Sequence, residues 1–179
     1  MRAHLSKAKK ILSDWKGDSY AFGWNVLEMA GHYASKFGRK CTLVVTELGQ
    51  TWTEEARAKV ESSLKRNAVD FEIVTGARPN APLDDLYRIS HQVARSKSEG
   101  IIALGGGSTI DAAKAAAVLN TYSPTEVFDI LGAKLSEADS IEPYFGTGLV
   151  TRLQEKTGRA VMPVIALSLI HISEPTRPY

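Results

Sequence analysis

The chain has 179 residues, 44% of them apolar and 23% charged, with a formal net charge of +2. These are the proportions of an ordinary globular protein, and a chain of this length can bury about 70% of its unfolded surface. So small a net charge, with Lys and Arg spread along the chain, argues against an electrostatic nucleic-acid binder. The single cysteine, Cys41, excludes an internal disulfide framework, and its apolar neighbours predict a buried, unreactive thiol.

The start of the chain is polar. Residues 1–18 contain no apolar stretch of the kind that a secretory signal carries. No apolar run in the chain approaches the ~20 residues that a membrane helix needs. We therefore expect a cytoplasmic protein whose partners include neither a membrane nor a nucleic acid.

Strands and helices are predicted to alternate over the first two thirds of the chain. Tyr20 to Gly23 is predicted to be a short strand that ends in a glycine turn. Two apolar runs without polar alternation predict strands buried on both faces, at residues 42–45 and 101–104, and residues 71–74 are predicted to form a further strand. Apolar residues at helical spacing predict helices at residues 27–37 and 84–96. The cap residue Thr53 and the acidic pair after it predict a helix at residues 53–67, and a small-residue helix is predicted at residues 108–119. This order predicts an α/β fold, a Rossmann-like parallel sheet with helices on both faces.

Beyond Asn120 the pattern is weaker. Pro124 to Leu131 is predicted to form a short helix, and residues 132–159 are predicted to be mostly loop with room for one more helix. Val161 to Ala166 is predicted to be a final buried strand.

The stretch from Leu104 to Lys114 carries the strongest chemical signal. A predicted strand ends in Gly105, Gly106 and Gly107, and a helix follows at once. Glycines let a ligand approach the backbone closely, and a helix start offers free N–H groups and the positive end of a dipole. Open α/β sheets also bind ligands beyond the carboxyl ends of their strands. The stretch therefore predicts a cradle for a phosphate or pyrophosphate.

A plainer interpretation of the same residues stays open. Glycines are common in strand-to-helix turns, and Ser108 with Asp111 resembles a capping box in which Asp replaces Glu. The chain has no P-loop motif, and Ile110 stands where a Rossmann fingerprint has its third glycine. The acidic residue that such a fingerprint needs downstream is found instead after an earlier strand, as Glu47.

The run Gly-Gly-Gly-Ser-x-x-Asp-x-Ala-Lys at residues 105–114 resembles a signature of the iron-containing alcohol dehydrogenases, metal-dependent enzymes of the dehydroquinate synthase-like superfamily. Three weaker matches follow in the family's order. They are an opening Phe-Gly turn, a strand ending in Thr-Asp and a Pro-Asn-Pro loop, at residues 20–23, 44–47 and 78–82. The resemblance implies the N-terminal half of a two-domain dehydrogenase.

By that resemblance, the glycine turn holds the pyrophosphate of the cofactor. The residues implied to hold the pyrophosphate are Gly106, Gly107 and Ser108, and their neighbours Gly105 and Thr109 are implied to belong to the cofactor site. Asp111 matches a position close to the nicotinamide and the substrate, whereas Lys114 is interpreted as a helix-surface residue. Asn80 is implied to line the adenosine side. Glu47 matches the carboxylate that binds the adenosine ribose, which favours NAD over NADP because a carboxylate repels a 2′-phosphate.

The family's metal site has no counterpart in the sequence. Family members bind a divalent metal, Fe or Zn, through one Asp and three His in an all-helical second domain, and those positions are absent here. His4, His32 and His91 show no metal-ligand spacing. Residues 167–179 do not resemble the family and look like translated adapter DNA from a sequencing library. We therefore interpret residues 1–166 as an incomplete NAD(P)-binding domain and 167–179 as a non-native tail.

The implied function is that of an NAD(P)-dependent, metal-dependent alcohol dehydrogenase, which transfers hydride between an alcohol or carbonyl substrate and nicotinamide. The fragment alone is expected to be inactive and to hold no catalytic residue, while the full-length protein is expected to act on a small alcohol, aldehyde or ketone and to form homo-oligomers. A lyase like dehydroquinate synthase and a polyol-phosphate dehydrogenase are variants within the superfamily. The alternatives outside it are a stand-alone nucleotide-binding module without catalysis, and a purely structural glycine turn.

Overall fold

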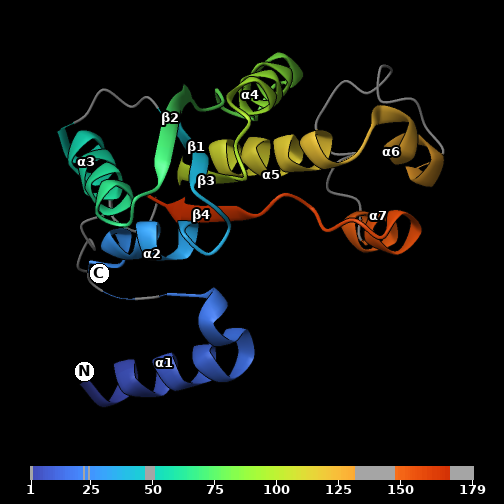
Figure 1. The fold of residues 1–179 in the computed structure, drawn as a ribbon. Coiled ribbons are helices and arrows are strands. Elements are labelled where there is room, and N and C mark those ends of the chain that lie inside the picture. Colours follow the sequence, from blue (N-terminus) through green and yellow to red (C-terminus); the bar gives the residue numbers. More distant parts are fainter. Residues whose placement is uncertain (1, 22, 24, 47–50, 132–147, 170–179) are drawn as a thin grey trace.

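The computed structural model describes residues 2–21, 23, 25–46, 51–131 and 148–169. The strands of these residues form a four-stranded parallel sheet in the order β2-β1-β3-β4 (Figure 1). They are β1 (Lys40–Val45), β2 (Asp70–Thr75), β3 (Gly100–Gly105) and β4 (Val164–Ser168). The predicted α/β class with a parallel sheet is confirmed.

Helices connect these strands. The chain opens with α1 (Arg2–Lys16) and the 3-10 helices η1 (Gly17–Ser19) and η2 (Val26–Met29). The α-helices that follow are α2 (Ala30–Ala34), α3 (Thr51–Arg66), α4 (Leu83–Ser96), α5 (Gly107–Thr121), α6 (Pro124–Leu131) and α7 (Leu149–Thr157). None of the described helices is both long and apolar enough to cross a membrane.

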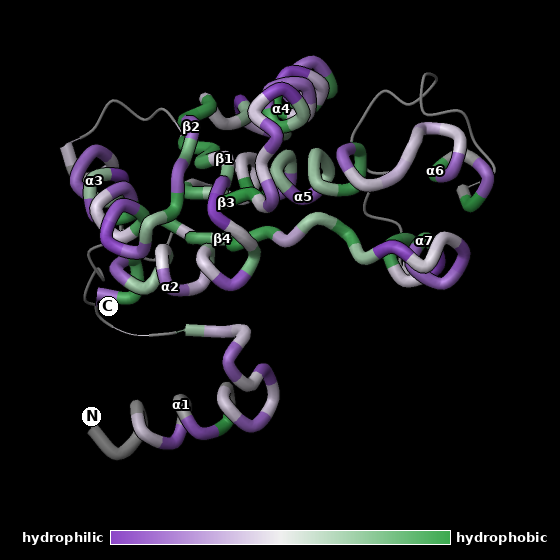
Figure 2. Tube along the Cα trace, in the orientation of Figure 1, coloured by the Kyte–Doolittle hydropathy of each residue, from purple (hydrophilic) through white to green (hydrophobic). Residues whose placement is uncertain are grey.

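The two faces of the sheet pack into separate cores. Alternate residues of the central strands point to opposite faces, so that Val44 and Ala103 pack with α4 and α5. Their neighbours Leu43 and Ile102 pack with α2 and α3 on the other face. Figure 2 shows apolar residues concentrated along the strands and hydrophilic ones on the outer turns of α3 and α4. Burial on both faces explains why β1 and β3 read as continuous apolar runs.

The two ends of the described sheet are less buried than its centre. The strand predicted at residues 71–74 is present as β2, and Ile73 in it is 48% exposed. In β4 the residues are half-buried, and Ala166 is exposed. Both strands lie at an end of the sheet order, where a strand has only one described neighbour and less helical cover.

The last strand also begins and ends later than predicted. β4 starts at Val164, because Pro163 has no N–H to give to a ladder. It continues past Ala166, so that Leu167 pairs with Leu104 and Ser168 with Gly105. The predicted start of a non-native tail at residue 167 therefore falls inside a strand. The sequence Leu-Ser-Leu is compatible with a strand whatever its origin.

The start of the chain differs most from the prediction. The polar lead-in forms the helix α1, which stands apart from the sheet in Figure 1, and its many Ala, Leu and Lys residues are good helix formers. Tyr20 and Ala21 belong to no strand, and Tyr20 is 48% exposed. A run this short gains nothing as a strand without a neighbour to pair with. The predicted loop at residues 132–147 lies outside the described residues.

Candidate functional site

The carboxyl ends of β1, β2 and β3 lie at one edge of the sheet, because the three strands are parallel neighbours. The residues that follow them are Thr46, Gly76 and Gly106. Backbone hydrogen bonds hold these ends together, since the N–H of Thr46 donates to Leu104 at 3.0 Å and that of Gly76 donates to Val45 at 2.7 Å. The glycine turn and the start of α5 are therefore built on a rigid edge.

The first turn of α5 is open on its outer side. Gly106 is the N-cap residue and has an extended backbone, with φ −83° and ψ −177°. A Cβ on Gly107 would meet no atom within 4 Å. Because the cap residue has no side chain, it cannot satisfy the first free N–H groups of the helix, which leaves them available to a ligand.

The capping-box interpretation of Ser108 is wrong. The helix begins one residue earlier than predicted, so Ser108 lies within its first turn. The Ser108 hydroxyl instead accepts a hydrogen bond from the backbone N–H of Asn80, at 3.0 Å. Asn80 and Ala81 have φ of 65° and 45°, a left-handed turn that brings this loop over the helix start. The structure thus brings together two residues that the sequence predicted for one site.

An ion-pair cluster that the sequence prediction missed holds the Asn80 loop. The backbone N–H and the Nε of Arg78 both donate to Oδ2 of Asp85, each at 2.9 Å. Arg88 donates to the carbonyls of Thr75 and Gly76, at 2.9 and 2.8 Å, and to Asp85 at 3.3 Å. The sequence contains one indication of this cluster, since two acidic residues in the first turn of α4 have an Arg on either side.

The pKa of Asp85 reflects this cluster. Its side chain is only 9% exposed, and burial would raise the pKa of the carboxyl. The hydrogen bonds from Arg78, and then the one from Arg88, outweigh burial and hold the pKa of Asp85 below its ordinary value. Asp85 therefore stays ionised and keeps the loop closed on α4.

Two residues of the predicted cofactor set face inward. Thr109 is 1% exposed, and its hydroxyl lies 2.6 Å from that of Thr46. Gly105 is buried at the end of β3, where a Cβ would overlap the Thr46 hydroxyl. Only backbone atoms of these residues could face a ligand. Gly107, Ser108 and Asn80 are the members of the set that surround the open side.

The remaining predicted residues lie farther along α5 or outside the described part. Asp111 is half-exposed and pairs with Lys114, with 3.6 Å between Oδ1 and Nζ. Lys114 is also half-exposed, as expected of a helix-surface residue. Glu47 lies outside the described residues.

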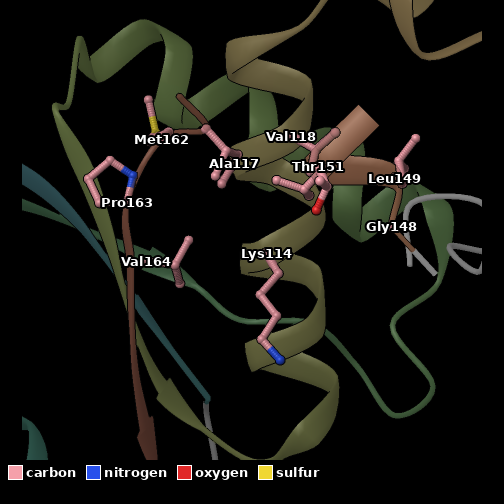
Figure 3. A pocket seen from close by; sticks show the side chains of 11 residues that line it. Lys114, Ala117, Val118, Gly148, Leu149, Thr151, Met162, Pro163 and Val164 are labelled. Atoms are coloured by element: carbon pink, nitrogen blue, oxygen red, sulfur yellow. The ribbon is translucent and has the colours of Figure 1, made fainter. Parts of the chain in front are cut away.

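A cavity of about 490 Å³ lies along α5, away from the glycine turn (Figure 3). Its lining comes from α5, from the start of α7 and from the segment before β4. Figure 3 shows Ala117, Val118 and Met162 toward one end and the Lys114 amine toward the other. Sequence reasoning gave no sign of this cavity, because the segments that line it are far apart in the chain.

Within the described ranges, no group of three or more His, Cys, Asp or Glu side chains could hold a metal ion. His32 lies in α2 and His91 in α4, on opposite faces of the sheet. These residues do not fit the metal that the resemblance implies for the full-length protein.

The fold and the site define a parallel α/β domain in which a glycine turn opens a helix at the carboxyl edge of the sheet. The family model of the iron-containing alcohol dehydrogenases matches residues 18–163. The chain belongs to the iron-containing alcohol dehydrogenase family, a family of oxidoreductases, as its glycine segment predicted.

Two curated relatives illustrate the match. A probable mitochondrial hydroxyacid-oxoacid transhydrogenase of Dictyostelium discoideum is 30% identical over 111 residues, which are 62% of this chain and 20% of the relative. An NADPH-dependent butanol dehydrogenase of Clostridium saccharobutylicum is 31% identical over 71 residues, 40% of this chain and 18% of the relative. The chain thus spans about a fifth of the length of these relatives.

Solved structures of the family share the fold. The NADH-dependent butanol dehydrogenase A of Thermotoga maritima is 24% identical with a TM-score of 0.55, over 67% of this chain and 30% of that one. An alcohol dehydrogenase from Oenococcus oeni is 22% identical with a TM-score of 0.58, over 83% of this chain and 33% of that one. Both matches take up about a third of the solved chains.

Proposed function

We propose that this chain is the dinucleotide-binding part of an NAD(P)-dependent, metal-dependent alcohol dehydrogenase. The observation that carries the proposal is the open first turn of α5, at the carboxyl edge of the sheet in a chain of this family. The nicotinamide cofactor, when bound, supplies the hydride acceptor or donor for a small alcohol, aldehyde or ketone.

The residues at the turn fit a pyrophosphate. With Gly107 lacking a side chain, nothing shields the N–H groups of the first turn from an anion. The Ser108 hydroxyl oxygen accepts from Asn80, and its O–H can donate to a further acceptor, a role that a phosphate oxygen would fill. We assign pyrophosphate binding to the backbone of Gly106 and Gly107 and to Ser108, and the adenosine side to Asn80. Asp111, one turn along α5, is assigned to the nicotinamide end.

The first test is a substitution that fills the open turn. Gly107→Val should abolish NADH binding, because the new side chain stands where the pyrophosphate would lie. It should barely change the melting temperature, since a Cβ there meets no atom within 4 Å. NADH fluorescence measures binding, and far-UV circular dichroism measures melting.

Ala94→Val is the control, because it places the same valine side chain at an exposed position of α4. It should leave NADH binding unchanged. If the Gly107 variant bound NADH as tightly as the parent chain, the turn would not be the pyrophosphate site.

Glu47 is proposed to select NAD over NADP. The names of two relatives point to different cofactors, NADH in one and NADPH in the other, so the choice must lie in local residues. Glu47→Ser removes the charge that would repel a 2′-phosphate, and should shift the ratio of NADPH to NADH affinity at least about tenfold toward NADPH. Glu55→Ser on α3 is the control. An unchanged ratio would remove Glu47 from the site.

The metal and the substrate pocket are proposed to belong to an all-helical part encoded beyond residue 166, with residues 167–179 a non-native tail. On this proposal the present chain binds the cofactor but does not turn over. Sequencing the source gene past the codon for Ala166 tests it. A frame that continues with one Asp and three His on helical segments supports the dehydrogenase. A frame that ends as printed leaves a nucleotide-binding module without catalysis.

The cytoplasmic location and the homo-oligomeric state expected from the sequence remain proposals. Two of the relatives are named as mitochondrial enzymes. Fractionation of the source cells would test the location, and light scattering on the product of the complete gene would test the oligomeric state.

A further inference from the structure

Three neighbouring strand ends meet around one buried side chain, that of Thr109 in the first turn of α5. Its hydroxyl lies 2.6 Å from the hydroxyl of Thr46, the residue that follows β1. The backbone N–H of Thr46 donates to Leu104 of β3 at 3.0 Å. The two threonines therefore join the start of α5 to the ends of β1 and β3.

Two glycines leave the room that this pair occupies. A Cβ on Gly105 would overlap the Thr46 hydroxyl and would lie 3.1 Å from the Cβ of Thr109. A Cβ on Gly76, which follows β2, would lie 2.5 Å from the Thr109 hydroxyl. Gly105 and Gly76 are thus required by the threonine pair itself, whereas Gly107 has open space around it.

Thr109 directly follows Ser108, the side chain assigned to the pyrophosphate, in the first turn of α5. We propose that the Thr46–Thr109 hydroxyl pair is a positioning device, which sets the distance between the pyrophosphate turn and the end of β1. The inference rests on the proposed function and deepens it, because the two threonines act on the cofactor only by placing the turn that contains Ser108.

The hydrogen bond sets a spacing that packing alone could not. Two hydroxyl oxygens approach to 2.6 Å here, whereas two methyl groups in contact stay about 3.5–4.0 Å apart. Replacing both threonines by valine should therefore separate the start of α5 from the end of β1 by about 1 Å. It should lower the melting temperature by only a few degrees, since no buried donor or acceptor is left without a partner and the added methyl groups need only this small shift.

The test compares the parent 179-residue chain with the double variants Thr46→Val/Thr109→Val and Thr46→Ser/Thr109→Ser. NADH affinity is measured by fluorescence titration, and melting by circular dichroism. The valine pair should melt within a few degrees of the parent chain yet bind NADH about tenfold more weakly. A tenfold loss of affinity corresponds to the free energy of about one hydrogen bond. The serine pair keeps both hydroxyls and should retain most of the affinity.

Two results would overturn the positioning role: parent-like affinity in the valine pair, or an equal loss of affinity in the serine pair. If the valine pair does not fold, Thr46→Val against Thr46→Ser decides in the same way, with affinity corrected for the folded fraction. Failure of the parent chain itself to bind NADH at millimolar concentration would instead reject the proposed cofactor site, whatever the variants do.

Discussion

Cys41 shows how completely a residue's surroundings can set its chemistry. The side chain is 4% exposed in β1, and burial raises the pKa of its thiol to about 12. The sequence predicted this burial from the apolar neighbours alone. The capping box suggested at Ser108 was wrong, because α5 begins one residue earlier than predicted and its N-cap residue is Gly106.

The raised pKa of Cys41 predicts slow alkylation. In the folded chain the rate with iodoacetamide should keep rising about tenfold per pH unit up to pH 10, because only the thiolate reacts. In urea the rate should level off near pH 8.5, the ordinary range of a free cysteine. Mass spectrometry of timed samples measures both profiles. A plateau near pH 8.5 without urea would show that the thiol is accessible in the native state.

Asp85 should make the free energy of unfolding depend on pH in the acidic range. Its pKa is lowered on folding, since the hydrogen bonds from Arg78 and Arg88 outweigh the effect of burial. A carboxyl group whose pKa is lower in the folded than in the unfolded state stabilises the fold at pH values above its unfolded pKa, roughly 4. This stabilisation is lost as the pH falls through the folded pKa. Asp85→Asn should therefore cost on the order of 1 kcal/mol in urea unfolding at pH 7.

The difference between Asp85→Asn and the parent chain should shrink as the pH falls below about 4. Asp84→Asn is the control, because the Asp84 side chain is 71% exposed and its ion pair with Arg78 should contribute little. A cost that stayed constant down to pH 2.5 would mean that the Asp85 charge is not what holds the loop.

At the scale of elements, helices α2 and α3 are in close contact at Gly31. Its N–H donates to the Ser63 hydroxyl at 2.9 Å, and that hydroxyl donates to the carbonyl of Glu28 at 2.6 Å. A Cβ on Gly31 would overlap the Ser63 carbonyl and lie 2.7 Å from Nδ2 of Asn67. The two helices can therefore approach this closely only if the position is glycine.

Gly31→Ala should lower the free energy of unfolding by about 1–3 kcal/mol, the usual cost of overpacking. Urea denaturation followed by circular dichroism measures it. Gly107→Ala is the matched control, since the same added methyl meets no atom within 4 Å there. Equal stability of the two variants would show that α2 can move away from α3 at little cost.

Strands that are buried on both faces could be predicted from the sequence. The limits of exposed strands and the contacts between side chains across a loop could not. The central strands β1 and β3 appear as unbroken apolar runs because helices cover both their faces. β2 and β4 have one described neighbour each, so burial no longer dictates their pattern, and β4 begins and ends later than predicted. The cluster around Asp85 depends on side chains meeting across a loop, which spacing along the chain does not reveal.

At the scale of the whole molecule, the sheet order β2-β1-β3-β4 reverses the direction in which the chain winds. After β1 the chain turns to α3 on one face, and after β3 it turns to α5 on the other. The connections leave β1 and β3 in opposite directions, so the carboxyl ends of these two strands form the topological switch point at which open α/β sheets generally bind ligands. Thr46 and Thr109 join the two strands at this point. A switch point depends on how the chain winds and not on particular side chains, so a change of residue in the glycine turn would leave it in place.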